Sequence, residues 1–303
     1  MSLLEDRKTG WPDAATIIVN WNTRELLRNC LTSLEQSKSD RLSQIVVVDN
    51  ASSDGSAAMV RAEFPGVTLI QPGRNTGYAA GNNLGIQAVH EPYILLLNPD
   101  TEVTAGAIDR LARFLDDHPR CAVVAPQLFS PGGAVQRSCR GFPEPAALLA
   151  ELTGIAQIWP SLSGYRMAGW NHDTERPVDQ PMGSALMTRR EAIDEAGLMD
   201  EQFPLFFNEV DWIYRIKKRG WEVWFTPTAR ILHHVGGSTR QIPLRSAWLS
   251  HTGLHAFYRK HYRSRLRPAL YRVVIAAVYL HAAVVVALRG ARQLVLRLRS
   301  AIS

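Results

Sequence analysis

Short apolar runs alternate with helical segments through the first 125 residues, and this alternation constrains the fold more than any other feature of the chain. Buried strands of parallel sheets are short continuous apolar runs, and the helices between them cover both faces. The sequence predicts strands and helices in turn at residues 16–19, 25–36, 44–48, 56–64, 67–70, 93–97, 105–116 and 121–125. We therefore expect an α/β fold with a mostly parallel sheet.

Polar residues directly follow these predicted strands. Asn20 and Asn22 come after the first strand, Asp49 after the second, Asn75 after the third and Asp100 after the fourth. In open α/β sheets, ligands bind beyond the carboxyl ends of the strands. We therefore expect these side chains to lie at one edge of the sheet and to form a binding site.

Two of these positions indicate the chemistry of a ligand. A carboxylate such as Asp49 can accept a hydrogen bond from the ring N–H of uracil or thymine, although a turn or helix-capping aspartate is the alternative. Asn98 and Asp100 project the same way from an extended chain, and such a pair can hold a divalent cation together with a diphosphate. A plain strand-ending turn is the alternative at this second position.

Three later residues are candidates for catalysis or metal binding. Glu209 and Asp211 point to one side of an extended backbone but splay apart in a helix. One of them could act as a general base on a hydroxyl group, or both could favour the start of the helix predicted at 212–219. His233 is a candidate metal ligand because neutral imidazole binds divalent cations, with a structural role as the alternative.

The middle of the chain differs in composition from the parts on either side. Residues 130–180 are rich in Gly, Pro and Trp and show little periodicity, which predicts an insertion or long loop over the site. Regular elements are expected again at residues 181–187, 190–196, 212–219 and 221–225.

Charge is distributed unevenly along the chain. After Glu222 there are thirteen Lys and Arg and no Asp or Glu, whereas the preceding part has 21 basic and 28 acidic residues. Arginines flank the apolar residues 273–288, and these 16 residues are fewer than the roughly 20 that a spanning helix needs. We therefore expect a pair of helices that lies on an anionic membrane surface.

These features divide the chain into an N-terminal extension (1–13), a sheet domain (14–245) and a C-terminal helical, membrane-associating region (246–303). The first 13 residues lack the basic start and apolar run of a signal peptide. The cysteines Cys30, Cys121 and Cys139 are scattered and form no disulfide or zinc pattern. We expect a cytoplasmic protein that is peripherally associated with the inner face of the cell membrane.

Six segments, in this order, resemble the inverting glycosyltransferases of family 2, closest to the rhamnosyltransferase-like branch, over about residues 16–240. They are Ile17-Ile18-Val19-Asn20-Trp21-Asn22, Val47-Val48-Asp49-Asn50-Ala51-Ser52-Ser53-Asp54-Gly55-Ser56, Asn75-Thr76-Gly77-Tyr78-Ala79-Ala80-Gly81-Asn82-Asn83, Leu97-Asn98-Pro99-Asp100, Phe206-Phe207-Asn208-Glu209-Val210-Asp211-Trp212 and His233-His234-Val235-Gly236-Gly237-Ser238-Thr239. The resemblance implies the GT-A fold, a Rossmann-like sheet with helices on both faces, followed here by the helical tail.

The resemblance also implies a role for each candidate residue. Asp49 reads the pyrimidine base, and Asp100 and His233 bind a divalent cation, Mg²⁺ or Mn²⁺. Asn98-Pro99-Asp100 stands in for the D-x-D motif of the family. Glu209 falls where many members have the catalytic Asp of an E-D pair, so it is the expected base, with Asp211 as the other candidate. The other residues expected to bind the nucleotide sugar are Asn20, Trp21, Asn22, Asn75, Gly77, Asn82 and Asn98.

The reaction implied is a single displacement with inversion. A sugar, rhamnose in this branch, passes from a nucleoside-diphosphate sugar to a saccharide or lipid-linked saccharide acceptor in the synthesis of cell-envelope polysaccharide. The metal and positive groups stabilise the departing diphosphate, while the base removes the proton of the acceptor.

Two other functions are compatible with parts of the sequence. A nucleotidyltransferase needs a glycine-rich loop with a basic residue after the first strand, where this chain has Asn20-Trp21-Asn22-Thr23-Arg24. A non-catalytic basic protein is compatible with a sequence pI near 9.4. The apolar residues within the basic tail favour a membrane, and not nucleic acid, as the partner of that region.

Overall fold

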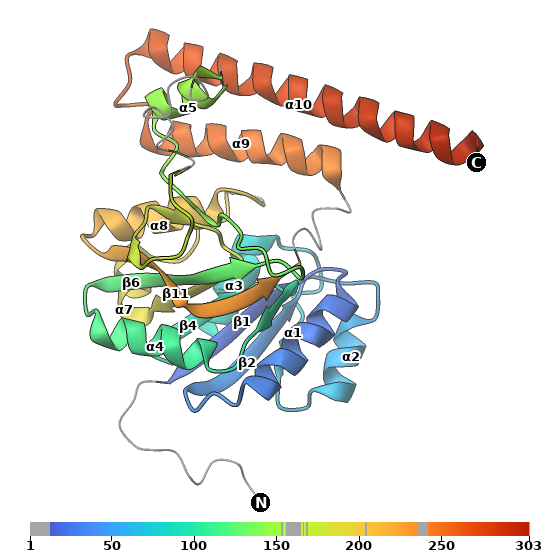
Figure 1. Ribbon diagram of the computed structural model, residues 1–303, viewed down its shortest axis with the longest axis vertical. Helices are drawn as coiled ribbons and strands as arrows, with labels where there is room; N and C mark the ends of the chain where they lie inside the picture. The colour runs from blue at the N-terminus through green and yellow to red at the C-terminus, as the bar shows by residue number, and fades with distance from the viewer. Residues whose placement is uncertain are drawn as a thin grey trace, which may run out of the picture.

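The computed structural model of the protein describes residues 13–152, 154–155, 165, 167, 169–203, 205–234 and 242–302. In these ranges a central sheet lies between two layers of helices, and two C-terminal helices lie over one side of this body (Figure 1). The predicted N-terminal extension up to residue 12 and residues 235–239 of the last motif lie outside the described residues.

Nine strands of the described residues form the main sheet, in the order β3-β2-β1-β4-β10-β6-β11-β5, with β8 paired to β11. The strands β1, β2, β3, β4, β6 and β11 run in one direction, and β10, β5 and β8 run against them. A separate pair joins β7 to β9. The bounds are β1 Ala14–Asn20, β2 Leu42–Asp49, β3 Thr68–Ile70, β4 Tyr93–Leu97, β5 Thr101–Val103, β6 Cys121–Phe129, β7 Cys139–Arg140, β8 Arg176–Pro177, β9 Gln180–Pro181, β10 Ala185–Arg189 and β11 Glu222–His233.

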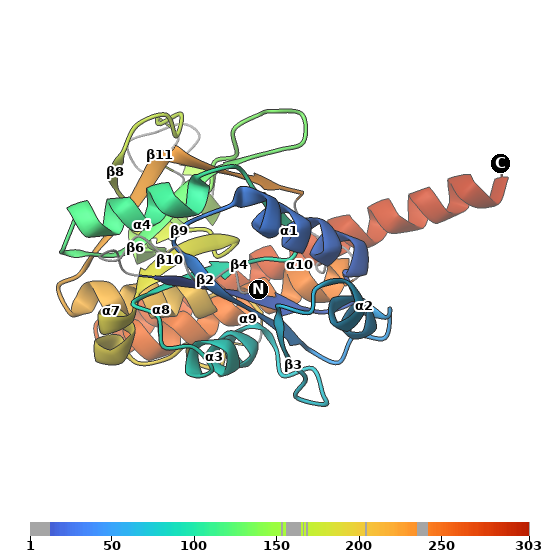
Figure 2. The same ribbon diagram turned by 90° about the horizontal axis from the view of Figure 1, so that it is seen from below.

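Helices cover both faces of the sheet (Figure 2). One layer is α1 (Arg24–Ser37), α2 (Ser56–Glu63) and α4 (Ala107–Asp117), and the other is α3 (Tyr78–Gln87), α7 (Arg190–Ala196) and α8 (Asn208–Lys218). The neighbours Ile17 and Ile18 of β1 belong to different cores because successive strand residues point to opposite faces. The predicted mostly parallel sheet with helices on both faces is therefore confirmed.

The glycine-spaced stretch after β3 forms α3, a helix that the sequence analysis does not predict. A Cβ on Gly85 would lie 2.3 Å from Cγ2 of Ile17, and one on Gly81 would lie 2.7 Å from Cγ1 of Val19. Glycine therefore lets this helix approach β1 closely, which outweighs the poor helix propensity of glycine itself.

The later part of the chain departs from prediction in three places. Residues 130–180 are not one loop, because they contain the helix α5 (Pro145–Leu152) as well as β7 and β8. The strand expected at 181–187 is divided between β9 and β10. Helix α8 begins at Asn208 instead of 212, so the two acidic residues of that motif lie on a helix and splay apart.

The C-terminal helices are α9 (Pro243–His261) and α10 (Pro268–Ile302), so α9 begins before the boundary predicted at 246. They share a third core with α5 and α8, formed by residues such as Leu148, Val210, Phe257 and Val278. Within α10, the segment Pro268–Ala291 is long and apolar enough to cross a membrane by length and composition. The apolar segment is therefore longer than the 16 residues expected from the sequence.

Candidate active site

The carboxyl ends of β1 and β2 meet in a polar cluster around Asp49. The register pairs Asn20 with Asp49, and Nδ2 of Asn20 donates to Oδ1 of Asp49 at 2.9 Å. The other carboxylate oxygen accepts from the backbone N–H of Ser52 at 3.1 Å. Asp49 is only 1% exposed, and both of its carboxylate oxygens are used within this cluster. In that turn Asn22 has a φ of 51°, and its side chain accepts from the N–H of Ser53, while Trp21 is half-buried.

The turn before α3 connects this cluster to the centre of the edge. Nδ2 of Asn50 donates to the carbonyl of Gly77 at 3.0 Å, and the side chain of Asn75 accepts from the N–H of Gly77 at 2.9 Å. Asn75 is exposed, whereas Asn82 is buried and donates to the carbonyl of Tyr78 within α3. Asn75 is therefore open to a ligand, and Asn82 is used inside the helix.

Asp100 and His233 come together at the ends of β4 and β11. Oδ1 of Asp100 lies 3.6 Å from Nε2 of His233, and both side chains are less than a tenth exposed. The hydroxyl of Ser184 lies 3.2 Å from the same nitrogen. The backbone N–H of the half-buried Asn98 donates to the carbonyl of Ser184, which holds β10 beside this pair. Burial lowers the pKa of His233, which keeps the imidazole neutral, although the charge of Asp100 acts against this.

Glu209 lies at the start of α8, next to the same part of β10. A Cβ placed on Gly183 would lie 3.3 Å from Cγ of Glu209. Burial raises the pKa of Glu209 to about 7, and the nearby charge of Arg140 only partly opposes this. The hydroxyl of Tyr78 donates to the carbonyl of Gly183 at 2.8 Å, and burial together with the charges of Glu209 and Asp100 raises the pKa of Tyr78. Glu209 and Asp100 are therefore neighbours of one tyrosine.

Asp211 has a different environment from Glu209, although it is only two positions further along α8. It is 0% exposed and accepts hydrogen bonds from His261 at 2.7 Å, from Lys260 at 2.9 Å and from Arg215 at 2.9 Å. Burial acts to raise the pKa of Asp211, but these three hydrogen bonds outweigh it and hold the pKa at about 2. Such a carboxylate joins α8 to α9 and has little basicity.

The structure thus brings most of the predicted residues to one edge of the sheet, and Asn98, Asp100, Glu209 and His233 lie around Gly183 and Ser184 there. Neither of these two residues is predicted from the sequence, and the same holds for Tyr78 and Gln136. Oε1 of Gln136 lies 2.8 Å from Nδ1 of His233. Of these residues, Tyr78 alone lies in a recognised motif, and the others lie in segments without a pattern that could have identified them.

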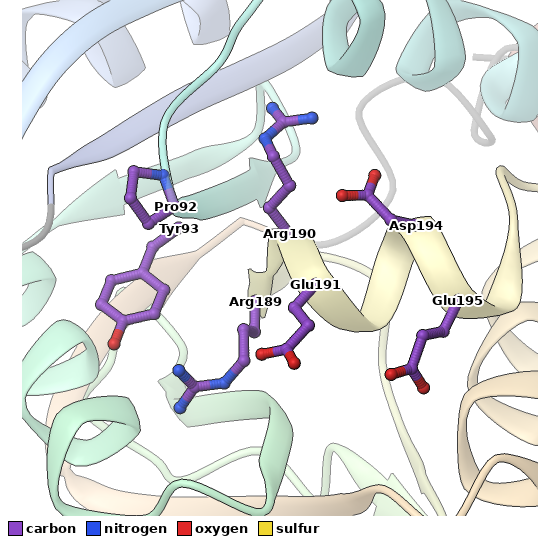
Figure 3. A pocket seen from close by; sticks show the side chains of 7 residues that line it. All are labelled: Pro92, Tyr93, Arg189, Arg190, Glu191, Asp194 and Glu195. Atoms are coloured by element: carbon purple, nitrogen blue, oxygen red, sulfur yellow. The ribbon is translucent and has the colours of Figure 1, made fainter.

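A separate cavity of about 560 Å³ lies at the amino end of β4 (Figure 3), whereas this site lies beyond the carboxyl ends of the strands. Arg189 and Arg190 point away from each other there, and both donate to backbone carbonyls, those of Leu115 and Val89 among them. The acidic residues on its rim belong to α7 and are Glu191, Asp194 and Glu195. Because its arginines are used to hold the backbone, the cavity has a structural explanation.

A sequence model described as Glycosyl transferase family 2 matches residues 16–172, which is just over half of the chain. The chain belongs to glycosyl transferase family 2. Over 256 residues it is 27% identical to an N-acetylglucosaminyl-diphospho-decaprenol L-rhamnosyltransferase of Mycobacterium tuberculosis, a match that covers 80% of this chain and 82% of the relative. It is 26% identical over 216 residues to the low-salt glycan biosynthesis hexosyltransferase Agl10 of Haloferax volcanii, with 70% and 64% covered.

Solved structures share the fold of this glycosyltransferase. The mannosyltransferase PcManGT from Pyrobaculum calidifontis, in complex with GDP-Man and Mn²⁺, has a TM-score of 0.58 at 17% identity, over 97% of this chain and 81% of that chain. GalNAc-T7 with UDP, GalNAc and Mn²⁺ has a TM-score of 0.56 at 15% identity, over 75% and 44%. The GT-A fold and the rhamnosyltransferase-like branch predicted from the sequence are confirmed, and the nucleotidyltransferase and non-catalytic alternatives are not supported.

Proposed function

We propose that this glycosyltransferase transfers rhamnose or a related sugar, with inversion, from a nucleoside-diphosphate sugar to a lipid-linked saccharide in cell-envelope polysaccharide synthesis. The observation that carries the proposal is the arrangement of Asp100, His233 and Glu209 around the Gly183–Ser184 backbone. Asp100 and His233 provide ligand atoms for a cation that would also bind a diphosphate. Glu209 provides a carboxylate of raised pKa beside them.

The side chains of Asp100 and His233 fit a divalent cation. A carboxylate oxygen and an imidazole nitrogen are ligands that Mn²⁺ accepts, and Mg²⁺ also binds through one or two carboxylates plus phosphate oxygens. No group of three His, Cys, Asp or Glu side chains in the described residues could hold a metal ion by itself. A cation at Asp100 and His233 would therefore share its remaining positions with the diphosphate, whose leaving charge it neutralises.

The protein groups then divide the work. Glu209, with a pKa of about 7, can accept a proton from an acceptor hydroxyl near neutral pH. Asn20 and Asn22 support the turn that holds Asp49, and we assign Asp49 to recognition of the nucleotide base. Asn75 and Gly77 line the path from the nucleotide base to the diphosphate. Asn98 fixes Ser184 beside the cation position.

Substrate identity and the role of Asp100 can be tested together. Thermal shift with UDP-, GDP- and dTDP-linked sugars, each with Mg²⁺ or Mn²⁺, should identify the donor, because a ligand that binds only the native state raises the apparent stability. Transfer to a polyprenyl-diphospho-N-acetylglucosamine acceptor should then depend on the cation and be abolished in Asp100→Ala. Near-normal turnover of that variant would refute the metal role, and absence of transfer to this acceptor would refute the acceptor class.

The C-terminal helices support a membrane location for this reaction. Nine large hydrophobic side chains of the described residues are exposed, and seven of them lie on α9 and α10, namely Leu244, Trp248, Leu270, Val273, Leu280, Val284 and Leu288. On α10 the opposite side is buried through Val274, Val278 and Ala282. Exposed apolar surface beside arginines is typical of a helix at an anionic membrane. We assign this surface to the inner face of the cell membrane.

The membrane assignment requires variants of the exposed surface, because α9 shares a core with α8 and its deletion would disturb the site. The double variant Leu280→Glu/Leu288→Glu changes side chains that are 69% and 67% exposed. The variant Asn29→Asp/Gln87→Glu adds the same charge at exposed positions elsewhere. We expect the wild type and this control to sediment with phosphatidylglycerol vesicles and the leucine variant to stay in solution. Equal sedimentation of all three would contradict the assignment.

A further inference from the structure

The side chain of Gln136 makes two hydrogen bonds to a single residue, His233. Its Nε2 donates to the backbone carbonyl of His233 at 2.8 Å, and its Oε1 lies 2.8 Å from Nδ1 of the same residue. A carbonyl oxygen can only accept, so the amide nitrogen must face it, and the amide oxygen must therefore face the ring. The orientation of the amide follows from this pair of contacts.

The amide orientation determines which ring nitrogen of His233 carries the proton. Because Oε1 of Gln136 can only accept, Nδ1 must be the protonated nitrogen. In the neutral ring Nε2 then carries the lone pair, and the hydroxyl of Ser184 can donate to it. That lone pair faces Oδ1 of Asp100 at 3.6 Å and the hydroxyl of Ser184 at 3.2 Å.

This arrangement favours a cation between Asp100 and His233. Two electron-rich atoms face each other at a distance that is too long for a hydrogen bond. Histidines that bind metals commonly donate their other N–H to an acceptor, which fixes both the tautomer and the orientation of the ring. Gln136 supplies this acceptor from outside every segment that carries the family resemblance.

We propose that Gln136 is a positioning residue that holds His233 in the tautomer whose Nε2 is unprotonated and can bind a divalent cation beside Asp100. The proposal rests on the metal site of the proposed function and deepens it. Gln136 lies between α4 and α5, on the segment that follows β6, where its backbone N–H donates to the carbonyl of Leu128. The ligand histidine at the end of β11 is thereby fixed by a different part of the chain.

The test uses the full chain labelled with ¹⁵N-histidine, freed of metal, at a pH well above the ordinary histidine pKa of about 6.5. Long-range ¹H–¹⁵N correlation spectra report the tautomer of His233, and paramagnetic resonance of free Mn²⁺ reports binding of the metal alone. Gln136→Met keeps the size of the side chain but cannot accept from Nδ1. Gln136→Glu retains the acceptor. Gln127→Met is the matched control, because Gln127 is an amide on β6 that donates to the carbonyl of His172.

In the wild type, Gln136→Glu and Gln127→Met, we expect the Nδ1–H tautomer and similar affinities for Mn²⁺. In Gln136→Met we expect a mixture of tautomers and Mn²⁺ binding weakened about 10- to 100-fold. An unchanged tautomer or an unchanged Mn²⁺ affinity in Gln136→Met would overturn the proposal while leaving the metal site intact. Should Gln136→Met not fold, loss of Mn²⁺ binding in a folded Gln136→Glu would overturn it equally. A wild type that binds no Mn²⁺ would contradict the metal site itself.

Discussion

The two sides of helix α8 differ sharply, although the residues that define them are two positions apart. One side presents Glu209 to the Gly183–Ser184 backbone, and burial raises the pKa of this carboxyl to about 7. The other presents Asp211 to α9, where Lys260 and His261 help to hold its pKa at about 2. Two residues rotate a helix by about 200°, so one short motif serves both surfaces. Environment, and not residue type, therefore separates the proposed proton acceptor from the structural anion.

The two C-terminal helices also differ from each other in what they contact. α9 contacts α8 through Asp211 and lies close to the turn before it, whereas α10 exposes a row of apolar side chains. The two helices therefore have different roles. α9 completes the environment of α8, and α10 provides most of the surface that we assign to the membrane.

The contrast between Glu209 and Asp211 depends most strongly on Glu209 being the catalytic base. Gln is similar in shape to Glu but cannot take a proton, so Glu209→Gln should lower kcat by about 10²- to 10⁴-fold. The melting temperature should stay the same or rise, because a buried carboxyl has been replaced by a neutral group. The matched control is Glu191→Gln, an exposed carboxyl in the first turn of α7 at the other edge of the sheet. A kcat of Glu209→Gln within tenfold of the wild type would assign the base elsewhere.

Asp211→Ala tests the structural side of α8. Removal of the carboxylate leaves Lys260, Arg215 and His261 without their shared acceptor, and breaking a buried ion pair in this way costs about 3–5 kcal/mol. Urea unfolding should show this loss. Asp179→Ala removes the partner of Lys217 in a pair whose carboxylate is 46% exposed, and it should cost no more than about 1 kcal/mol. Equal losses for the two variants would remove the distinction between Asp211 and a surface carboxylate.

The close packing of α9 against the turn before α8 gives a weaker test. A Cβ on Gly253 of α9 would lie 2.8 Å from the carbonyl oxygen of Phe206, and the next residue, Phe207, has a φ of 70°. We expect Gly253→Ala to cost about 1–3 kcal/mol and to lower kcat several-fold, because the start of α8 must shift. Gly290→Ala on α10 meets nothing within 4 Å and should be neutral or stabilising. Identical behaviour of the two alanine variants would show that α9 does not support α8.

Much of the fold was predictable because its signal is local. The runs at 16–19, 44–48 and 93–97 are apolar enough to identify buried strands, and parallel strands bring their carboxyl ends to one edge. This explains why Asn20, Asp49 and Asp100 could be predicted at one edge from the sequence: the register pairs Asn20 with Asp49, and β4, which Asp100 follows, pairs in parallel with β1. Helix α3 was not predicted because glycine has poor helix propensity, whereas its glycines are required there by the close approach of the helix to β1.

The rest of the site depends on contacts between distant residues. Asp211 meets Lys260 and His261 across about fifty positions, and Gln136 meets His233 across nearly a hundred. No spacing rule predicts such pairs. The choice between Glu209 and Asp211 was open in the sequence for this reason, since the two carboxylates differ only in what the tertiary structure brings to them.

The two carboxyls of α8 also differ in the pH dependence that they predict. If Glu209 must be deprotonated, kcat should rise about tenfold per pH unit below a pKa of about 7 and level off above it. The carboxyl of Glu209 binds its proton more tightly in the folded state than in the unfolded chain, where the pKa is about 4.3. Its contribution to stability is therefore lost as the pH rises from about 4.3 through 7, and Glu209→Gln should remove this loss.

Asp211 has the opposite sign. Its folded-state pKa of about 2 lies below the unfolded value of about 3.9, so its contribution is present above about 3.9 and is lost as the pH falls toward 2. Urea midpoints of the wild type and the two variants between acid and neutral pH separate these windows. If Glu209→Gln changed stability between about pH 2 and 3.9, and not between about pH 4.3 and 7, the two carboxyls would have exchanged roles. Helix α8 would then present its base to α9.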